Sequence, residues 1–452
     1  MNNPALKQNK KIPTKFIVSK CLNLEDNPFI SFISNTKKII CPECDKLYYD
    51  KSTLTIHIKN VHKGQKEKCI YCGGEYKYLN KHLKTCKLKR IENQNISENN
   101  ISINSNINDY SKLQLNKEIC YYPDLIIGSG STTTVYYGKN IQKDIDLAIK
   151  METLQKGEIP NSFFEDFITK QMSNIEGFAI NYGYFKINNK EIILQTLFGP
   201  SLRRLFNFCD RKFTLRTICI IFIESLKRLK DLHTSGFLHN DINMQNFSWG
   251  KFVSGKLIGK NTINLIDFGA SSKYIYPLYD EKNNSNNIIG YKTYPKEKLN
   301  YIDGTLEYLD RSVLDGYRPS RKTDIISLVY LIIEMFKGEL PWSLLSSKKF
   351  SEKVKEIKRI HKNTKVIDLF NNIPCEFYTI YNELQKLMHG DKPDYLKYEN
   401  LVMNLFLKNG GKVGEKFCWE PEIEKIFSNI KNKLASNEEV QKIHNLFKGF
   451  PL

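Results

Sequence analysis

"FLHNDINMQN", residues 237–246, is the stretch of sequence that decides the fold. His239, Asp241 and Asn246 give it the spacing H-x-D-x-x-x-x-N, with apolar residues on both sides. Further along the chain, "INLIDFGAS" places a second aspartate, Asp267, directly after an apolar segment that is typical of a buried β-strand. Together the two stretches supply the carboxylates of Asp241 and Asp267 and the amide of Asn246, each next to an apolar segment.

Two stretches upstream favour an anionic ligand. "IIGSGSTTTVYYG" (126–138) predicts a glycine-rich turn between two strands, in which Gly128 and Gly130 let backbone amides approach phosphate oxygens. Thr133 stands where a third glycine of G-x-G-x-x-G is expected, so this turn alone is weak evidence. Lys150, in "LAIKME", is flanked by apolar strand residues and needs an anionic partner, and the phosphates of ATP meet that need.

The motifs and their order resemble those of the protein kinases. A glycine-rich turn, the lysine of V-A-I-K, an H-R-D-x-x-x-x-N loop and D-F-G follow one another along the chain. The resemblance implies that Lys150 binds ATP phosphates and that Asp241 accepts or orients the proton of the substrate hydroxyl. It also implies that Asn246 and Asp267 hold Mg²⁺ or Mn²⁺.

The same resemblance implies an ion-pair partner for Lys150 and a set of nucleotide contacts. Glu165, in "FFEDFITKQM", is the expected partner, with Asp166 as the competing choice. Adenine is expected at the backbone of Thr196 and Phe198. The nucleotide-binding residues are then Ile127, Gly128, Ser129, Gly130, Ser131, Val135, Lys150, Glu165, Thr196 and Phe198.

Three longer stretches look like the casein kinase 1 group in particular. They are "LFGPSLRRLFNFCDRKFTLRT" (197–217), "GELPW" (338–342) and "GDKPDYLKYENLVMNLF" (390–406). The similarity covers residues 118–425 and implies an ATP- and Mg²⁺-dependent serine/threonine protein kinase. It implies an α+β, bilobal fold with a small β-rich lobe and a large helical lobe, in which Asp324 braces the catalytic loop.

Three residues depart from the pattern of this group. Glu307, in "GTLEYLDRS", occupies the position of an arginine that helps to hold an anion in the group. With a glutamate there, this stretch looks more like the vaccinia-related kinases, a sister branch of the same group. Asn240 replaces the arginine of H-R-D, which we expect to affect regulation more than chemistry. Asn243 replaces a lysine that donates a charged hydrogen bond, worth about 1.5–3 kcal/mol. We therefore expect a slowed but active enzyme, with a pseudokinase scaffold as the rival.

Two short modules near the amino terminus have the spacing of zinc sites. The first is C-x2-C-x12-H-x4-H and resembles the two-cysteine, two-histidine zinc finger; the second is C-x2-C-x9-H-x3-C. Modules of this size need zinc to fold, because they bury too little apolar surface. The expected Zn²⁺ ligands are Cys41, Cys44, His57, His62, Cys69, Cys72, His82 and Cys86.

Charge points to an anionic partner for this region. The 452-residue chain has a net charge of +19, and residues 1–117 contain 21 Lys and Arg against 10 Asp and Glu. The base-reading positions of the first finger fall on Asp50, Thr53 and Ile56, none of which suits guanine or adenine. Non-specific nucleic-acid binding and docking to a protein scaffold are equally favoured; a nucleic-acid-binding protein with an auxiliary kinase domain is the second rival.

Composition and hydropathy complete the sequence-based prediction. With 41% hydrophobic and 12% aromatic residues, the chain can build a sizeable core. No signal peptide or transmembrane segment is evident, so we expect an intracellular protein, cytoplasmic or nuclear, monomeric and acting on protein substrates. The expected parts are a basic segment (1–37), the fingers (38–64 and 65–90), an Asn/Ser-rich linker (91–117), the kinase domain (118–425) and a charged helical tail (426–452).

Overall fold

The computed structural model describes most of the chain from residue 112 onward and four short strands before it. The described residues are 39–40, 47–48, 67–68, 75–76, 112–130, 132–153, 161–253, 256–279, 288–299, 301–343, 349–412, 414–432, 434 and 436–450. The chain divides into two compact units, Met1–Ile103 and Asn104–Leu452.

Two antiparallel hairpins are described in the first unit. β1 (Ile39–Ile40) pairs with β2 (Leu47–Tyr48), and β3 (Glu67–Lys68) pairs with β4 (Glu75–Tyr76). Each hairpin encloses one of the C-x2-C sequences. The eight expected zinc ligands themselves lie outside the described residues, as does most of the predicted linker.

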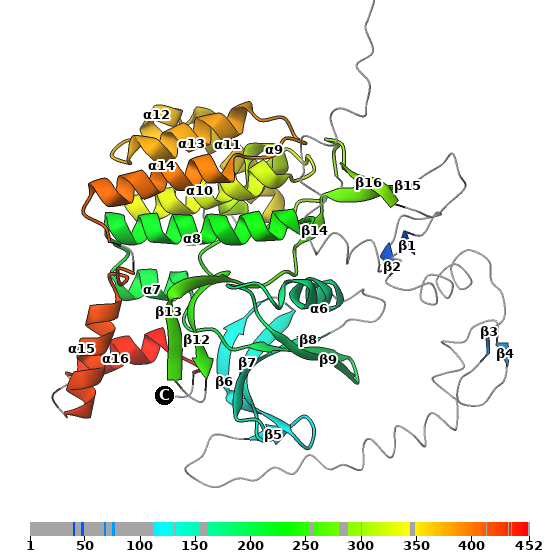
Figure 1. The fold of residues 1–452 in the computed structure, drawn as a ribbon, viewed down its shortest axis with the longest axis vertical. Helices are drawn as coiled ribbons and strands as arrows, with labels where there is room; N and C mark the ends of the chain where they lie inside the picture. The colour runs from blue at the N-terminus through cyan, green and yellow to red at the C-terminus, as the bar shows by residue number, and fades with distance from the viewer. Residues whose placement is uncertain are drawn as a thin grey trace, which may run out of the picture. The chain divides into compact units, whose positions relative to one another are not determined.

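The second unit begins with a six-stranded antiparallel sheet in the order β5-β6-β7-β8-β10-β9. Alternation along β8 sends Leu147, Ile149 and Met151 into a small core, which leaves Lys150 on the other face of the sheet. Helix α6 (Asn161–Met172) packs on β9 and β10 (Figure 1). The strands are β5 (Leu113–Gln114), β6 (Ile119–Ser129), β7 (Thr133–Asn140), β8 (Ile145–Thr153), β9 (Asn181–Ile187) and β10 (Lys190–Thr196).

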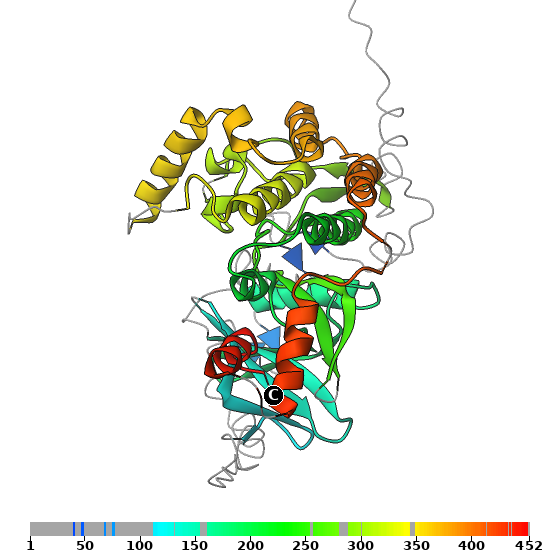
Figure 2. The same ribbon diagram turned by 90° about the vertical axis from the view of Figure 1, so that its left-hand side faces the viewer.

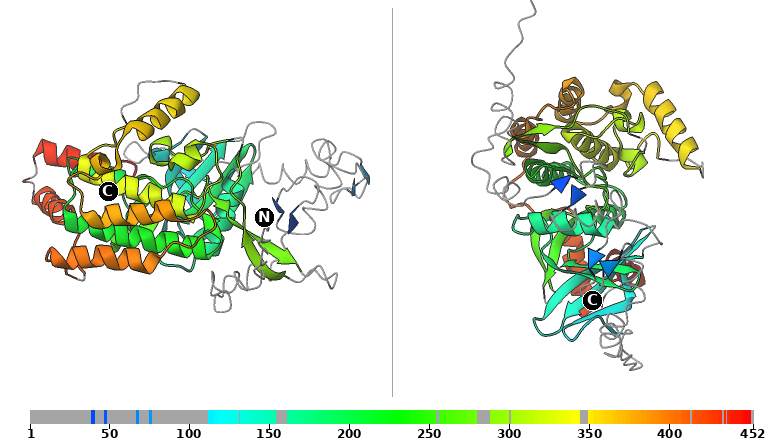
Figure 3. Two further views of the ribbon diagram at one scale, coloured as in Figure 1. Left: turned by 90° about the horizontal axis from the view of Figure 1, so that it is seen from above. Right: turned by 90° about the vertical axis from the view of Figure 1, so that its right-hand side faces the viewer.

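A larger helical lobe follows. Helices α8 (Leu215–Thr234), α10 (Arg321–Lys337) and α14 (Tyr395–Lys408) lie side by side (Figures 1 and 3). The apolar run 325–336 forms α10 and is buried along nearly its whole length, as expected of a core helix. The remaining elements are α7 (Leu202–Phe208), η3 (Leu306–Tyr308), α9 (Arg311–Leu314), α11 (Phe350–Asn363), α12 (Val366–Leu369) and α13 (Cys375–Lys386). The predicted α+β bilobal fold is confirmed.

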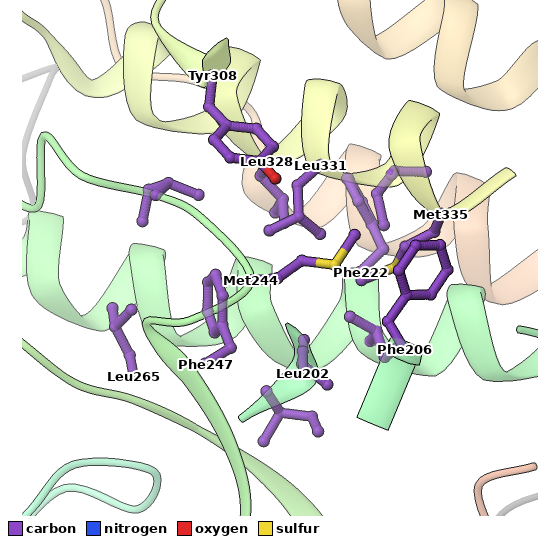
Figure 4. Close-up of a cluster of buried hydrophobic side chains, with 14 of the residues drawn as sticks. Leu202, Phe206, Phe222, Met244, Phe247, Leu265, Tyr308, Leu328, Leu331 and Met335 are labelled. Atoms are coloured by element: carbon purple, nitrogen blue, oxygen red, sulfur yellow. The ribbon is translucent and has the colours of Figure 1, made fainter. Parts of the chain in front are cut away.

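Short strands between the two lobes carry the loops with the polar motifs. Residues 239–246 run from β11 to β12, and Asp267 follows β13. Figure 4 shows Met244 among buried side chains of the helical lobe, including Phe222 and Leu331, so this loop is anchored in the core. The strands in this part of the chain are β11 (Phe237–Leu238), β12 (Phe247–Val253), β13 (Lys256–Leu265) and β14 (Ser272–Lys273), followed by the separate pair β15 (Ile275–Tyr279) and β16 (Ile288–Thr293).

The last two helices return to the β-rich lobe. α16 (Asn437–Leu446) packs against α15 (Glu420–Lys431) and α7, and Phe447, the residue after α16, contacts Phe252 of β12. Figures 1 and 2 show both helices, in red, at the β-rich end of the second unit. α15 crosses residue 425, where the sequence suggested a division between domain and tail. The tail is therefore packed against the domain that precedes it.

Candidate active site

Lys150 lies between two carboxylates. Its Nζ atom is 2.7 Å from Oε2 of Glu165 and 2.6 Å from Oδ1 of Asp267. β8 supplies the lysine, α6 the glutamate and the loop after β13 the aspartate. Three motifs that are far apart in the sequence thus meet at one ammonium group.

Burial and charge act in opposite directions on these three groups. Burial disfavours the charge on Lys150, but Asp267 and Glu165 outweigh it and raise the pKa of the ammonium. Burial raises the pKa of Glu165 to about 7, with Lys150 opposing the shift and Asp267 adding to it. Burial also opposes the charge on Asp267, yet Lys150 and the Gly269 N–H hold its pKa below the usual value. Glu165 is thus the member of the group whose charge changes near neutral pH.

Glu165, and not Asp166, is the partner of Lys150. Asp166 accepts hydrogen bonds from Lys170 Nζ at 2.7 Å and from Asn181 Nδ2 at 2.9 Å. It therefore connects α6 to its own next turn and to β9. The alternative that the sequence left open is decided by this geometry.

The carboxylate of Asp241 is oriented from two sides. Its Oδ1 atom accepts the backbone N–H of Thr305 at 2.7 Å and the Thr305 hydroxyl at 2.6 Å. Its Oδ2 atom accepts Asn246 Nδ2 at 2.9 Å. Thr305 was missed as a site residue in the sequence, although the "GT" before Glu307 was a signal for it.

Asn243 is used to build the loop. Its Oδ1 atom accepts the N–H groups of Gln245 at 2.8 Å and Asn246 at 3.3 Å, which is an Asx turn. Its Nδ2 group donates to Thr305 Oγ1 at 3.1 Å, and the residue is only 3% exposed. The Asn243 side chain, which stands at the lysine position of the kinase pattern, is therefore engaged inside the loop.

Asn240 ties the loop to the segment after D-F-G. Its Nδ2 group donates to the Ala270 carbonyl at 2.8 Å and to Ser272 Oγ at 2.9 Å. Its φ of 65° lies in the left-handed region, which asparagine adopts more readily than most residues. The short neutral side chain of Asn240 therefore connects the loop directly to residues 270 and 272.

Asp324 braces the same loop from α10, as predicted. Its carboxylate accepts the backbone N–H groups of His239 at 2.7 Å and Asn240 at 3.0 Å. It also lies 3.0 Å from Nε2 of His233, whose Nδ1 is 2.7 Å from the Tyr395 hydroxyl. Burial lowers the pKa of His233, so the neutral ring links Asp324 to Tyr395.

The glycine-rich turn is open above Gly128. A Cβ atom added to Gly128 would meet nothing within 4 Å, whereas Gly130 donates its N–H to the Thr133 carbonyl at 2.8 Å and closes the turn. Val135 pairs directly with Lys150 in the sheet. Ser129 is exposed, and Ser131 lies outside the described residues.

Phe198 lies in the segment that connects the two lobes, and its backbone N–H and C=O groups are directed away from β12. Phe198 forms an isolated antiparallel bridge with Lys251 of β12, and the residues on either side of Phe198 make the hydrogen bonds of that bridge. The N–H and C=O of Phe198 therefore point away from β12. Thr196 is held to Ile180 by two hydrogen bonds, through its N–H at 3.0 Å and its hydroxyl at 2.9 Å.

Gln195 is a further site residue that the sequence did not reveal. Its Nε2 group donates to Thr169 Oγ1 of α6 at 3.3 Å, and its side chain also hydrogen-bonds Glu165. Gln195 lies two residues after Ile193 in β10, and Ile193 pairs with Lys150, so the side chains of Gln195 and Lys150 are on the same face of the sheet. The strand register is what shows that Gln195 lies next to the Lys150–Glu165 ion pair.

A comparison with protein-family models matches residues 121–393 to the protein kinase domain. The chain belongs to the protein kinase family. Lys150, Glu165 and Asp267 are thus part of a kinase domain, for which ATP and Mg²⁺ are implied. The described residues include no helix that is long and apolar enough to cross a membrane.

Proposed function

We propose that this kinase is an active serine/threonine protein kinase of the casein kinase 1 type. The observation that carries the proposal is that both carboxylate oxygens of Asp241 are held, one by Thr305 and the other by Asn246. A carboxylate fixed on both oxygens in this way is suited to receive a hydroxyl group in one position. The ion pair of Lys150 with Glu165 supplies the second requirement of a working kinase.

The residues present fit a divalent cation. Within the described part of the chain, Oδ2 of Asp267 and Oδ1 of Asn246 have no hydrogen-bond donor, and the Asp267 side chain is 45% exposed. Magnesium prefers such oxygen ligands. Asp267 and Asn246 would hold it, and the ion when bound supplies charge neutralisation to the phosphates of ATP.

The remaining steps belong to protein groups. Asp241 accepts a hydrogen bond from the serine or threonine hydroxyl and orients its oxygen for attack. Lys150, kept cationic by its two carboxylates, contributes positive charge where the phosphates of ATP are bound. The outward-facing backbone of Phe198 offers a donor and an acceptor to adenine.

Glu307 supports a substrate that needs no earlier phosphorylation. The Glu307 carboxylate is 2.6 Å from Lys353 Nζ of α11, and its carbonyl accepts Trp342 Nε1 at 2.6 Å. An acidic residue that forms an ion pair here replaces the anion-holding arginine of the related group. We therefore propose that unmodified serine and threonine are accepted.

We also propose that the amino-terminal region contains two zinc modules that bind an anionic or protein scaffold. The support is the ligand spacing together with the hairpins β1-β2 and β3-β4 around each C-x2-C sequence. Release of Zn²⁺ by a chelator, counted per chain, tests the modules. Nucleic-acid affinity that falls steeply with salt would identify the scaffold as nucleic acid.

Single-turnover phosphate transfer from labelled ATP tests the activity. We expect transfer by the wild type and none by Asp241→Asn, with nucleotide binding unchanged in the variant. If the wild type binds Mg·ATP and transfers no more than the variant, the chain is a pseudokinase. The engaged amide of Asn243 is the observation that favours that outcome.

A further inference from the structure

The segment 436–450 is an ordered part of the domain. α16 begins with a capping box in which Ser436 and Glu439 exchange side-chain and backbone hydrogen bonds at 2.9 and 3.2 Å. Lys442 is 2.7 Å from Glu422 of α15, and Ile443 and Leu446 are buried. The helix is therefore anchored at its start and along its apolar face.

Two phenylalanines fix the end of this segment on β12. Phe447 and Phe450 are 3% and 5% exposed, and both contact Phe252, with ring centroids 6.4 and 5.2 Å away. The N–H of Phe252 donates to the carbonyl of Leu197 at 2.8 Å. The segment thus packs on the strand that supports the connection between the lobes.

Arg204 joins this segment to the glycine-rich strand. One terminal nitrogen of its guanidinium donates to the carbonyls of Leu446 at 3.3 Å and Lys448 at 2.7 Å. The other donates to the carbonyl of Ile127 at 2.5 Å. The guanidinium also lies over the ring of Phe450, 5.6 Å from its centroid. Burial lowers the pKa of Arg204, whose described hydrogen-bond partners are these three carbonyl oxygens.

Gly449 brings the two backbones into direct contact. Its φ is 85°, and a Cβ atom there would lie 2.1 Å from the carbonyl oxygen of Ile126 and 2.8 Å from the nitrogen of Ile127. Glycine is therefore needed both for its conformation and for its lack of a side chain. The contact ends one residue before Gly128, where the nucleotide-binding turn begins.

We propose that residues 446–450 and Arg204 form a clasp that holds the glycine-rich strand in its nucleotide-binding position. Arg204 acts here as a positioning residue. The proposal rests on nucleotide binding at the proposed site. A strand that is already held loses less conformational freedom when a nucleotide binds, so the clasp increases affinity. The opposite possibility, a tail that blocks the site, predicts tighter binding when the clasp is opened.

Gly449→Ala tests the clasp, with Gly410→Ala as its matched control. Gly410 has a φ of 77° and open space around it, so alanine there introduces the same backbone strain without the clash. The dissociation constant of Mg·ADP is measured by calorimetry on the full chain. We expect it to rise about threefold to tenfold in Gly449→Ala and to stay at the wild-type value in Gly410→Ala. A rise of this size corresponds to the loss of one or two hydrogen bonds. An unchanged or lower constant would overturn the proposal.

Arg204→Ala, with the exposed Arg359→Ala as its control, provides a second test. Hydrogen exchange of residues 119–130 should become faster in Arg204→Ala and in Gly449→Ala but not in either control. Equal exchange in all four variants would overturn the clasp. If the wild type binds no Mg·ADP, the proposed nucleotide site is wrong, and the exchange measurement still decides whether the clasp holds the strand.

Discussion

Thr305 donates both its backbone N–H and its hydroxyl to one oxygen of the Asp241 carboxylate, at 2.7 and 2.6 Å. The same hydroxyl oxygen accepts Asn243 Nδ2. One threonine thus connects the loop of residues 239–246 to the chain after D-F-G by three hydrogen bonds. The orientation of the Asp241 carboxylate depends on this connection.

Thr305→Val should therefore slow phosphate transfer. The change keeps the shape and the backbone N–H but removes the hydroxyl from a charged acceptor, a loss of about 1.5–3 kcal/mol, or about 10- to 150-fold in kcat. Thr305→Ser should restore most of the rate. Thr379→Val is the control, because the Thr379 hydroxyl donates to the Cys375 carbonyl of its own helix, α13. A wild-type kcat in Thr305→Val would contradict this role.

Glu165 should make stability depend on pH. Its pKa is raised to about 7 in the folded chain, so the folded state holds this proton more tightly than the unfolded state does. Its contribution is complete below about pH 4.5 and is lost as pH rises through about 7, a total of about 3 kcal/mol. Urea unfolding from pH 5 to 8 should show this loss in the wild type and not in Glu165→Gln. The exposed Glu356→Gln should follow the wild type.

Asn243→Lys should destabilise the protein. Lysine cannot accept the N–H groups of Gln245 and Asn246. The Asn246 N–H keeps the Asn243 carbonyl at 3.2 Å, so the partly buried N–H of Gln245 is the donor that loses its partner, at a cost of about 1–3 kcal/mol. We expect the free energy of unfolding to fall by that amount. This loss of stability is independent of any change that the lysine ammonium group makes to the rate of phosphate transfer. Asn363→Lys, at an exposed position of α11, should change stability by less than about 0.5 kcal/mol. Equal stability of the two variants would show that the Asx turn is dispensable.

Arg203 should be a main support of the helical lobe. Its guanidinium donates to both oxygens of the buried Glu334, at 2.8 and 3.1 Å, and to the Tyr308 hydroxyl at 2.7 Å. Arg203→Ala removes these bonds but leaves Glu334 with the Tyr308 hydroxyl and with Arg211 Nη2 at 3.6 Å, so we expect a loss of about 1.5–3 kcal/mol for hydrogen bonds to a charged group. Arg216→Ala, which removes an exposed pair with Glu415, should cost less than about 1 kcal/mol. Similar midpoints in urea for the two variants would refute the difference.

The sequence predicted those parts of the site that depend on local order. Lys150, Asp241, Asn246 and Asp267 stand in motifs with fixed spacing, and the bilobal fold followed from them. Thr305 and Gln195 were not predicted, because their roles depend on a strand register and on a hydrogen bond between residues 64 positions apart. Glu165 was the expected partner of Lys150, while Asp166 stayed a competing choice because the two residues are adjacent on the same turn of α6.

Arg204 has a consequence for the order in which the protein forms. Its bond to the Lys448 carbonyl joins residues that are 244 positions apart. At a synthesis rate of about 5–20 residues per second, α7 leaves the ribosome roughly 12–50 s before its partner segment exists. The β-rich lobe can fold in that interval, but the strand before Gly128 reaches its final neighbours only afterwards. Nucleotide binding is therefore expected to appear in a growing chain only after residue 448 has been synthesised.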